Sequence, residues 1–201
     1  MNKRIGRPRG PMPSIMNGID LLLKEYFDHF RGKKDLPPVI DELGIKGKII
    51  PDQKLIDKWR RGEELDYKDK KSGIILYGKL DEALLLPDNS YVPFDFKTRG
   101  FPPTETHQSY FVQLSVYCLL IKKAGFKTKN KGYLAYFYPL RGIMDFDRES
   151  LPFKVALTSV KTDLKMAEDL FKEAIECLKG PLPKYEKGCE FCQWILMDRE
   201  M

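Results

Sequence analysis

The chain has 201 residues, of which 42% are hydrophobic, and a formal net charge of +6 at pH 7. This length and composition predict one domain with a hydrophobic core. No apolar run approaches the roughly 18 residues that cross a bilayer, and no hydrophobic signal-peptide segment follows the charged N-terminus. Four cysteines in a chain of this length do not indicate a disulfide framework. We therefore exclude a membrane protein and expect an intracellular, cytoplasmic one. The positive net charge favours an acidic partner, and the most common acidic partner is nucleic acid.

The first 13 residues form a basic tail that is rich in Gly and Pro and has no hydrophobic periodicity. We expect this tail to be mobile when the chain is alone. Its Gly6-Arg7-Pro8 core, with Arg9 beside it, weakly resembles an AT-hook, which lays arginines into the minor groove. Arg7 and Arg9 are therefore candidate nucleic-acid contacts. A nonspecific arm that touches phosphates or aids solubility is the alternative.

Residues 14–31 have the spacing of an amphipathic helix that begins at Ser14 and ends before Gly32. Asp20, Lys24 and Asp28 are expected on its solvent face. The predicted apolar stripe consists of Ile15, Ile19, Leu22, Leu23, Tyr26, Phe27 and Phe30.

A polar, loop-rich region follows over residues 33–70 and contains a short predicted helix from Gln53 to Arg61, capped by Asp52. This helix carries a basic run that includes Arg60 and Arg61. A contact with the nucleic-acid backbone is the sharper interpretation of the run, and a solvated helix face is the alternative.

Two strands joined by a tight turn are predicted in the middle of the chain, over residues 74–86 and 91–97, with turn-forming residues at 87–90. Side chains alternate along a strand, so Asp95 and Lys97 share one face, and the opposite face is apolar. A turn of three or four residues places Asp81 opposite Asp95, or nearly so, roughly 5 Å away at Cβ. Two carboxylates and one lysine are therefore expected on one small patch.

Two carboxylates held so close repel each other unless a cation lies between them. Mg²⁺ typically takes one or two carboxylates, keeps several waters and accepts phosphate oxygens. A neighbouring lysine can orient or deprotonate water, or offset charge on a phosphate during transfer. The patch thus points to metal-assisted phosphodiester hydrolysis, and a solvated salt bridge is the alternative.

The rest of the chain predicts a loop over residues 99–106, a helix over 106–123, strands over 131–140 and 151–160, and a helix over 161–179. Arg99 follows the lysine closely enough to lie along a substrate. Gln113 and Tyr117 are four residues apart and so share one helix face. The order of elements is αββαββα, which predicts an α/β fold with a mixed β-sheet flanked by helices.

Three short motifs stand in order along this chain: Gly78-x-x-Asp81, Asp95-x-Lys97 and Gln113-x-x-x-Tyr117. Together they resemble the PD-(D/E)XK nuclease superfamily in its RecB-type branch, which includes nuclease domains of recombination helicases and CRISPR-associated adaptation nucleases. The resemblance covers residues 14–194 as a single domain and leaves 195–201 as a short C-terminal tail. It implies a restriction-endonuclease-like core and DNA cleavage that depends on Mg²⁺ or Mn²⁺.

The resemblance also implies roles for individual residues. Asp81, Asp95 and the carbonyl of Phe96 would bind the metal, and Lys97 would serve the attacking water or the transition state. Gln113 and Tyr117 would support this site. Related enzymes often carry a further acidic residue or a histidine on the first helix, and the candidates here are Glu25 and His29.

The cysteines depart from the pattern of those RecB-type nucleases that hold an iron–sulfur cluster with four cysteines. No cysteine precedes Cys118, which with Cys177 is expected in the core, so only Cys189 and Cys192 remain and no complete cluster is expected. Two alternatives to a nuclease stay open. One is a nucleic-acid-binding protein on the same fold that does not cut, and the other is a metal or redox module built on the CxxC pair.

Overall fold

The computed structural model describes residues 14–33, 37–41, 44–143, 150–181, 184–189 and 192. The tail with Arg7 and Arg9 and the last nine residues lie outside these ranges. The elements are, in chain order, α1 (Ser14–Phe30), α2 (Pro38–Asp41), β1 (Lys48–Ile49), α3 (Gln53–Arg61), β2 (Asp66–Lys68), β3 (Ile75–Tyr77), β4 (Glu82–Leu85), β5 (Tyr91–Thr98), α4 (Gln108–Lys123), β6 (Lys131–Pro139), β7 (Phe153–Lys161) and α5 (Leu164–Lys179).

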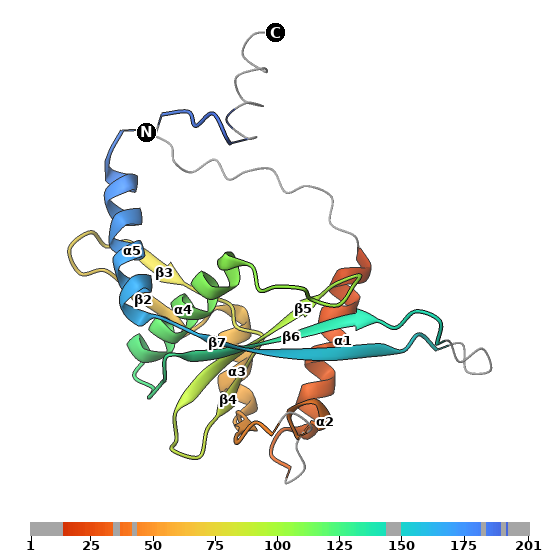
Figure 1. Ribbon diagram of the computed structural model, residues 1–201. Coiled ribbons are helices and arrows are strands. Elements are labelled where there is room, and N and C mark those ends of the chain that lie inside the picture. Colours follow the sequence, from red (N-terminus) through yellow and green to blue (C-terminus); the bar gives the residue numbers. More distant parts are fainter. Residues whose placement is uncertain are drawn as a thin grey trace.

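The main sheet has five strands in the order β1-β4-β5-β6-β7 (Figure 1). Strands β5 and β6 are parallel, because helix α4 connects them as a crossover, and the other neighbouring pairs are antiparallel. Strands β2 and β3 form a separate two-stranded sheet. The predicted α/β class, with a mixed sheet flanked by helices, is confirmed.

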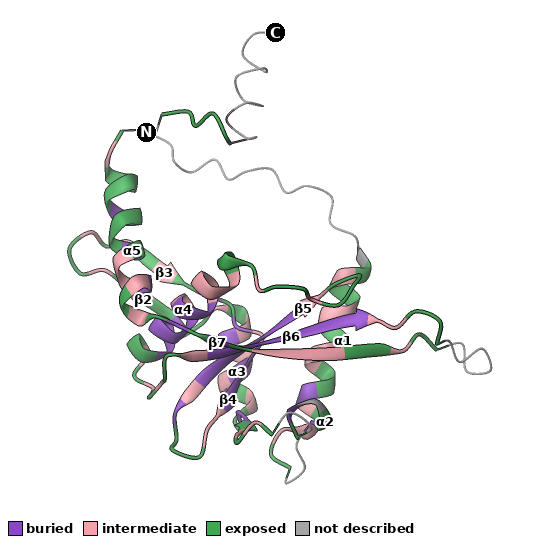
Figure 2. Ribbon diagram, viewed as in Figure 1, coloured by how far each residue is buried: buried purple, intermediate pink, exposed green. Residues whose placement is uncertain are grey.

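The two faces of the main sheet are covered by different helices. On one face, Phe27 of α1 stacks on Phe96 with ring centroids 4.6 Å apart and meets Phe94 edge-on. On the other face, α4 buries Leu114 and Tyr117 in one cluster with residues of β6. Figure 2 shows the buried residues concentrated in the central strands and α4, whereas α5 remains largely exposed. Because side chains alternate along β5, Asp95 and Lys97 lie on the face that α4 covers, opposite Phe94 and Phe96.

The prediction of one continuous strand over residues 74–86 is wrong. Strand β3 ends at Tyr77, residues 78–81 leave the sheet, and β4 begins only at Glu82. Gly78 permits this path, because a Cβ atom there would lie 2.9 Å from the ring of Tyr117. The following turn is tight as predicted: the amide of Leu86 donates to the carbonyl of Ser90, and Asn89 adopts a left-handed φ of 62°.

The helix starts reflect local capping. Asp52 caps α3 as predicted, and its carboxylate accepts a hydrogen bond from the amide of Leu55. Helices α4 and α5 begin two and three residues later than predicted, because His107 and Asp163 are their N-caps. No helix within the described ranges is long and apolar enough to span a membrane.

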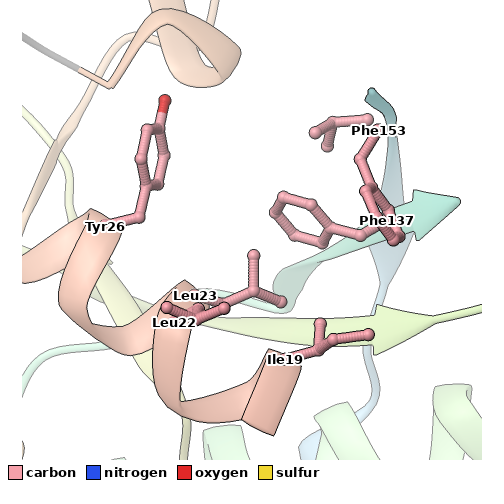
Figure 3. Close-up of a pocket in the computed structure, with 7 residues that line it drawn as sticks. Ile19, Leu22, Leu23, Tyr26, Phe137 and Phe153 are labelled. Carbon is pink, nitrogen blue, oxygen red and sulfur yellow. The ribbon is translucent and has the colours of Figure 1, made fainter. Parts of the chain in front are cut away.

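The apolar stripe of α1 is only partly buried. Phe27 is fully buried, but Ile15 and Leu22 remain 68% and 63% exposed, which contradicts a stripe directed wholly into the core. Leu22, unlike Ile15, lines an open apolar groove of about 410 Å³ between α1 and the ends of β6 and β7 (Figure 3). The groove is lined by Ile19, Leu22, Leu23, Tyr26, Phe137, Phe153 and Val155.

Candidate active site

Asp81, Asp95 and Lys97 lie together under α4. The β4–β5 register pairs Glu82 with Phe94, so Asp81, the residue before β4, stands opposite Asp95. The Lys97 Nζ atom is 2.5 Å from Asp95 Oδ2. The Asp81 carboxylate accepts a hydrogen bond from the amide of Phe96 at 3.2 Å. The structure thus brings together the patch that strand alternation and turn length predict.

Helix α4 supplies a chain of hydrogen bonds to this patch. Lys97 donates to Gln113 Oε1 at 3.0 Å, and the amide nitrogen of Gln113 donates to the Tyr117 hydroxyl at 3.2 Å. The Tyr117 hydroxyl in turn donates to the carbonyl of Lys79, two residues before Asp81. Burial raises the pKa of Tyr117, so its hydroxyl remains a donor at neutral pH. Gln113 and Tyr117 therefore connect Lys97 with the segment that carries Asp81.

The two carboxylates are incompletely neutralised. Asp95 is only 2% exposed, and burial raises its pKa to about 6, with Lys97 opposing this rise and Asp81 adding to it. Its Oδ2 atom accepts no well-directed hydrogen bond, although Lys97 is close. Burial also raises the pKa of Asp81, against the charge of Lys24 and the hydrogen bond from Phe96. Acid pairs with pKa values raised in this way are common at functional sites.

Helix α1 contributes a lysine and a carboxylate that were predicted to face solvent. Lys24 Nζ lies 3.6 Å from Asp81 Oδ1 and 2.6 Å from Asp20 Oδ2. The charge of Asp20 acts on both Asp81 and Asp95, raising their pKa values. The only sequence signal was an acid–base pair one turn apart, a pattern that solvated helices also show.

The two accessory candidates on α1 lie elsewhere. Glu25 and His29 are both exposed. His29 Nε2 is 3.1 Å from Lys33 Nζ, and its ring meets Phe30 edge-on. Within the described ranges, no hydrogen bond or ion pair joins Glu25 or His29 to Asp81 or Asp95.

The predicted nucleic-acid arginines occupy three different surroundings. Arg60 is largely buried, with a side chain 12% exposed, and its guanidinium binds Asp28. Arg61 is exposed and paired with Glu63. Arg99 is exposed, with its guanidinium 5.8 Å from the centre of the Tyr136 ring. Only Arg61 and Arg99 among these three present their charge to solvent.

The donor atoms fit a hard divalent cation. Two carboxylates and a nearby main-chain carbonyl are the oxygen ligands that Mg²⁺ and Mn²⁺ prefer. The buried Oδ2 of Asp95 has the Lys97 ammonium 2.5 Å away but no well-directed hydrogen bond, so it retains capacity to coordinate such a cation. Within the described ranges, no group of three or more His, Cys, Asp or Glu side chains forms a complete cage. Mg²⁺ needs no such cage, because it keeps waters and accepts phosphate oxygens.

The cysteines of the described ranges lie in unlike surroundings. Cys118 is buried, with its sulfur 3.3 Å from the hydroxyl of Thr162. Cys177 is exposed on α5, so the expectation that it belongs to the core is wrong. Residues 190–191, between Cys189 and Cys192, lie outside the description, and the expectation of no complete cluster stays a prediction.

Comparison with known proteins supplies the family. No curated protein matches the sequence significantly. The family model of the PD-(D/E)XK nuclease superfamily matches residues 16–195. The matched range includes Asp81, Asp95 and Lys97 and the whole main sheet. The chain therefore belongs to the PD-(D/E)XK nuclease superfamily.

Proposed function

We propose that this protein is an Mg²⁺- or Mn²⁺-dependent deoxyribonuclease of the RecB-like type. The observation that carries the proposal is the acid pair of the half-buried Asp81 and the buried Asp95, with Lys97 against it. Membership of a nuclease superfamily supports phosphodiester hydrolysis. The basic net charge favours a polyanionic substrate, and the Gln113–Tyr117 pair supports the RecB-like type.

Asp81, Asp95 and the Phe96 carbonyl would hold the cation. When bound, the cation would supply Lewis-acid stabilisation of charge on a phosphate oxygen and would lower the pKa of a water. Both carboxyl groups would have to be ionised for this, because a protonated acid is a poor metal ligand. Because the pKa of Asp95 is raised to about 6, activity should increase as the pH rises through that value.

Lys97 would act directly on the reacting atoms. Its ammonium has three donors, and Gln113 accepts one of them while Asp95 lies against the group. The remaining donor capacity can be directed at a water or at a non-bridging phosphate oxygen. Gln113 and Tyr117 would restrict the rotation of Lys97 and so reduce the entropy lost in reaching the transition state.

The test is cleavage of linear and circular DNA, single- and double-stranded, with Mg²⁺, with Mn²⁺ and with a chelator. Asp95→Ala should abolish cleavage, and Lys97→Ala should lower kcat by about 10³-fold, within the range of acid–base effects. The matched controls are Asp169→Ala and Lys165→Ala, which remove members of an exposed Asp–Lys pair on α5 and should leave kcat unchanged. Circular dichroism and thermal melting would verify that every variant is folded.

Undiminished cleavage by Asp95→Ala or Lys97→Ala would contradict these roles. Wild-type protein that binds DNA but never cuts it would instead favour the non-catalytic nucleic-acid-binding alternative. Sulfur-to-iron absorbance, or stoichiometric zinc, in anaerobically purified protein would favour the module built on Cys189 and Cys192.

A further inference from the structure

The segment that carries Asp81 is held by other elements rather than by strand pairing. Asp81 precedes the first residue pair of the β4–β5 ladder, so the ladder does not fix its backbone. Instead, successive backbone groups of residues 78–81 meet partners from α3, α4 and the loop after α3. These contacts are Gly78 N–H to Leu65 O, Tyr117 OH to Lys79 O, Leu80 N–H to Trp59 O, and Arg60 Nε–H to Asp81 O.

The last of these contacts comes from a buried and fully engaged arginine. Arg60 Nε donates to the Asp81 carbonyl at 3.0 Å. Its two terminal nitrogens donate to the Asp28 carboxylate at 2.8 and 3.0 Å, in the bidentate geometry that restrains a guanidinium most strongly. Nη2 also lies 3.5 Å from Glu82 Oε2. A side chain held on all its nitrogens and only 12% exposed has little left to offer a nucleic acid.

A second arginine in the same network provides an internal comparison. Arg31 is also buried and binds both Asp28 and Glu82, each at 2.5 Å. Its remaining donors reach the carbonyl of Ile50 and the side chain of Gln53. Arg31 therefore shares the two carboxylates with Arg60, but its hydrogen bonds and ion pairs in the described part of the chain do not include Asp81.

We propose that Arg60 is a positioning residue that sets the backbone of Asp81 and thereby the fit of the acid pair to the divalent cation. The inference rests on the proposed function and assigns Arg60 a different role from the DNA contact expected from sequence. Without the Nε–H donor, the carbonyl of Asp81 loses this anchor, and the carboxylate is held less firmly toward Asp95, by the Phe96 amide and Lys24 alone among the described contacts. Groups that orient metal ligands typically change metal affinity by about 10–100-fold.

The experiment measures Mn²⁺ binding to the full chain by electron paramagnetic resonance, with Arg60→Gln compared against Arg31→Gln. Both substitutions remove one positive charge from the same buried network, so both should lower the melting temperature. Only Arg60→Gln should weaken Mn²⁺ binding by at least about 10-fold. Both variants should bind DNA without metal within about 2-fold of wild type, with the same salt dependence.

Arg60→Lys supplies the measurement if Arg60→Gln does not fold. It keeps a positive charge near Asp28 and Glu82 but has no Nε–H fork for the Asp81 carbonyl, so it should show the same loss of Mn²⁺ affinity. Equal Mn²⁺ affinities in the Arg60 and Arg31 variants would overturn the proposal. Weaker DNA binding with a shallower salt dependence in the Arg60 variants would also overturn it, in favour of a phosphate contact. A wild-type protein that neither binds Mn²⁺ nor cuts DNA would instead refute the proposed function itself.

Discussion

Two charged clusters meet at consecutive residues of the chain, Asp81 and Glu82, and they differ in how their charges are satisfied. Glu82, which is fully buried, belongs to a cluster with Asp28, Arg31 and Arg60. Asp28 and Glu82 each contact both arginines, and the more exposed Asp57 lies 3.8 Å from Arg60. Burial raises the pKa of Glu82, yet both of its oxygens accept hydrogen bonds. Asp28 has a lowered pKa, because the hydrogen bonds from Arg60 and Arg31 outweigh its burial.

The neighbouring cluster is organised differently. Asp95 pairs with Lys97, Asp81 lies 3.6 Å from Lys24, and the half-exposed Asp20 adds a third carboxylate beside Lys24. Asp95 has its pKa raised to about 6 and an oxygen without a directed hydrogen bond. A fold can tolerate a buried charge when partners neutralise it, and an unneutralised one costs stability. This difference supports the proposal that the second cluster binds a cation, whereas the first stabilises the structure.

Removal of Glu82 should produce the largest loss of stability. Glu82→Ala leaves Arg31 and Arg60 short of a buried partner, which should cost about 3–5 kcal/mol of unfolding free energy. The balanced pair of substitutions, Glu82→Leu with Arg31→Leu, removes one charge of each sign and should recover most of that loss. Urea denaturation of the two variants and the wild type provides the measurement. A double variant no more stable than Glu82→Ala would show that charge balance does not govern this cluster.

The charged patch could be predicted from the sequence because it depends on local features of the chain. Strand alternation places Asp95 and Lys97 on one face, and turn-forming residues with an Asn that accepts a left-handed φ set the register that brings Asp81 opposite. Helical spacing likewise placed Gln113 and Tyr117 on one side of α4. These predictions need only the backbone period and a tight turn.

The sequence could not indicate which distant groups meet. The apolar run before Glu82 looks like a continuous strand, and the reason for its break at Gly78 is the close approach of Tyr117 and Leu120, which are far along the chain. Lys24 and Arg60 look like solvated helix residues, because charged side chains beside an apolar stripe are usually exposed. Their partners, Asp81 and Asp28, come from other elements, and no local pattern pairs them.

Removal of the Asp95 carboxylate from the second cluster should raise stability, in contrast to removal of Glu82 from the first. The pKa of Asp95 is higher in the folded protein than the ordinary value of 3.8, so the folded state binds its proton more tightly between about pH 4 and pH 6. The stability that protonated Asp95 contributes to the wild-type protein is therefore lost as the pH rises through that window. Asp95→Asn should be more stable than wild type at pH 7.5, by about 1–2 kcal/mol, and this advantage should vanish below about pH 4. Melting curves across this pH range test the prediction, and an Asn variant less stable at pH 7.5 would contradict it.

The smallest expected effect concerns two exposed arginines that differ in whether a neighbouring carboxylate offsets their charge. Arg61 is neutralised by Glu63, whereas Arg99 has no carboxylate partner within the described ranges and stands two residues after Lys97. Arg99→Ala should therefore raise KM for DNA about 3-fold, leave kcat unchanged and reduce the slope of log binding constant against log salt by about one, as expected for one lost phosphate contact. Arg61→Ala should change neither quantity measurably, because its charge is already offset where it lies. Equal effects of the two substitutions in titrations at several salt concentrations would mean that net charge, rather than position beside Lys97, attracts the nucleic acid.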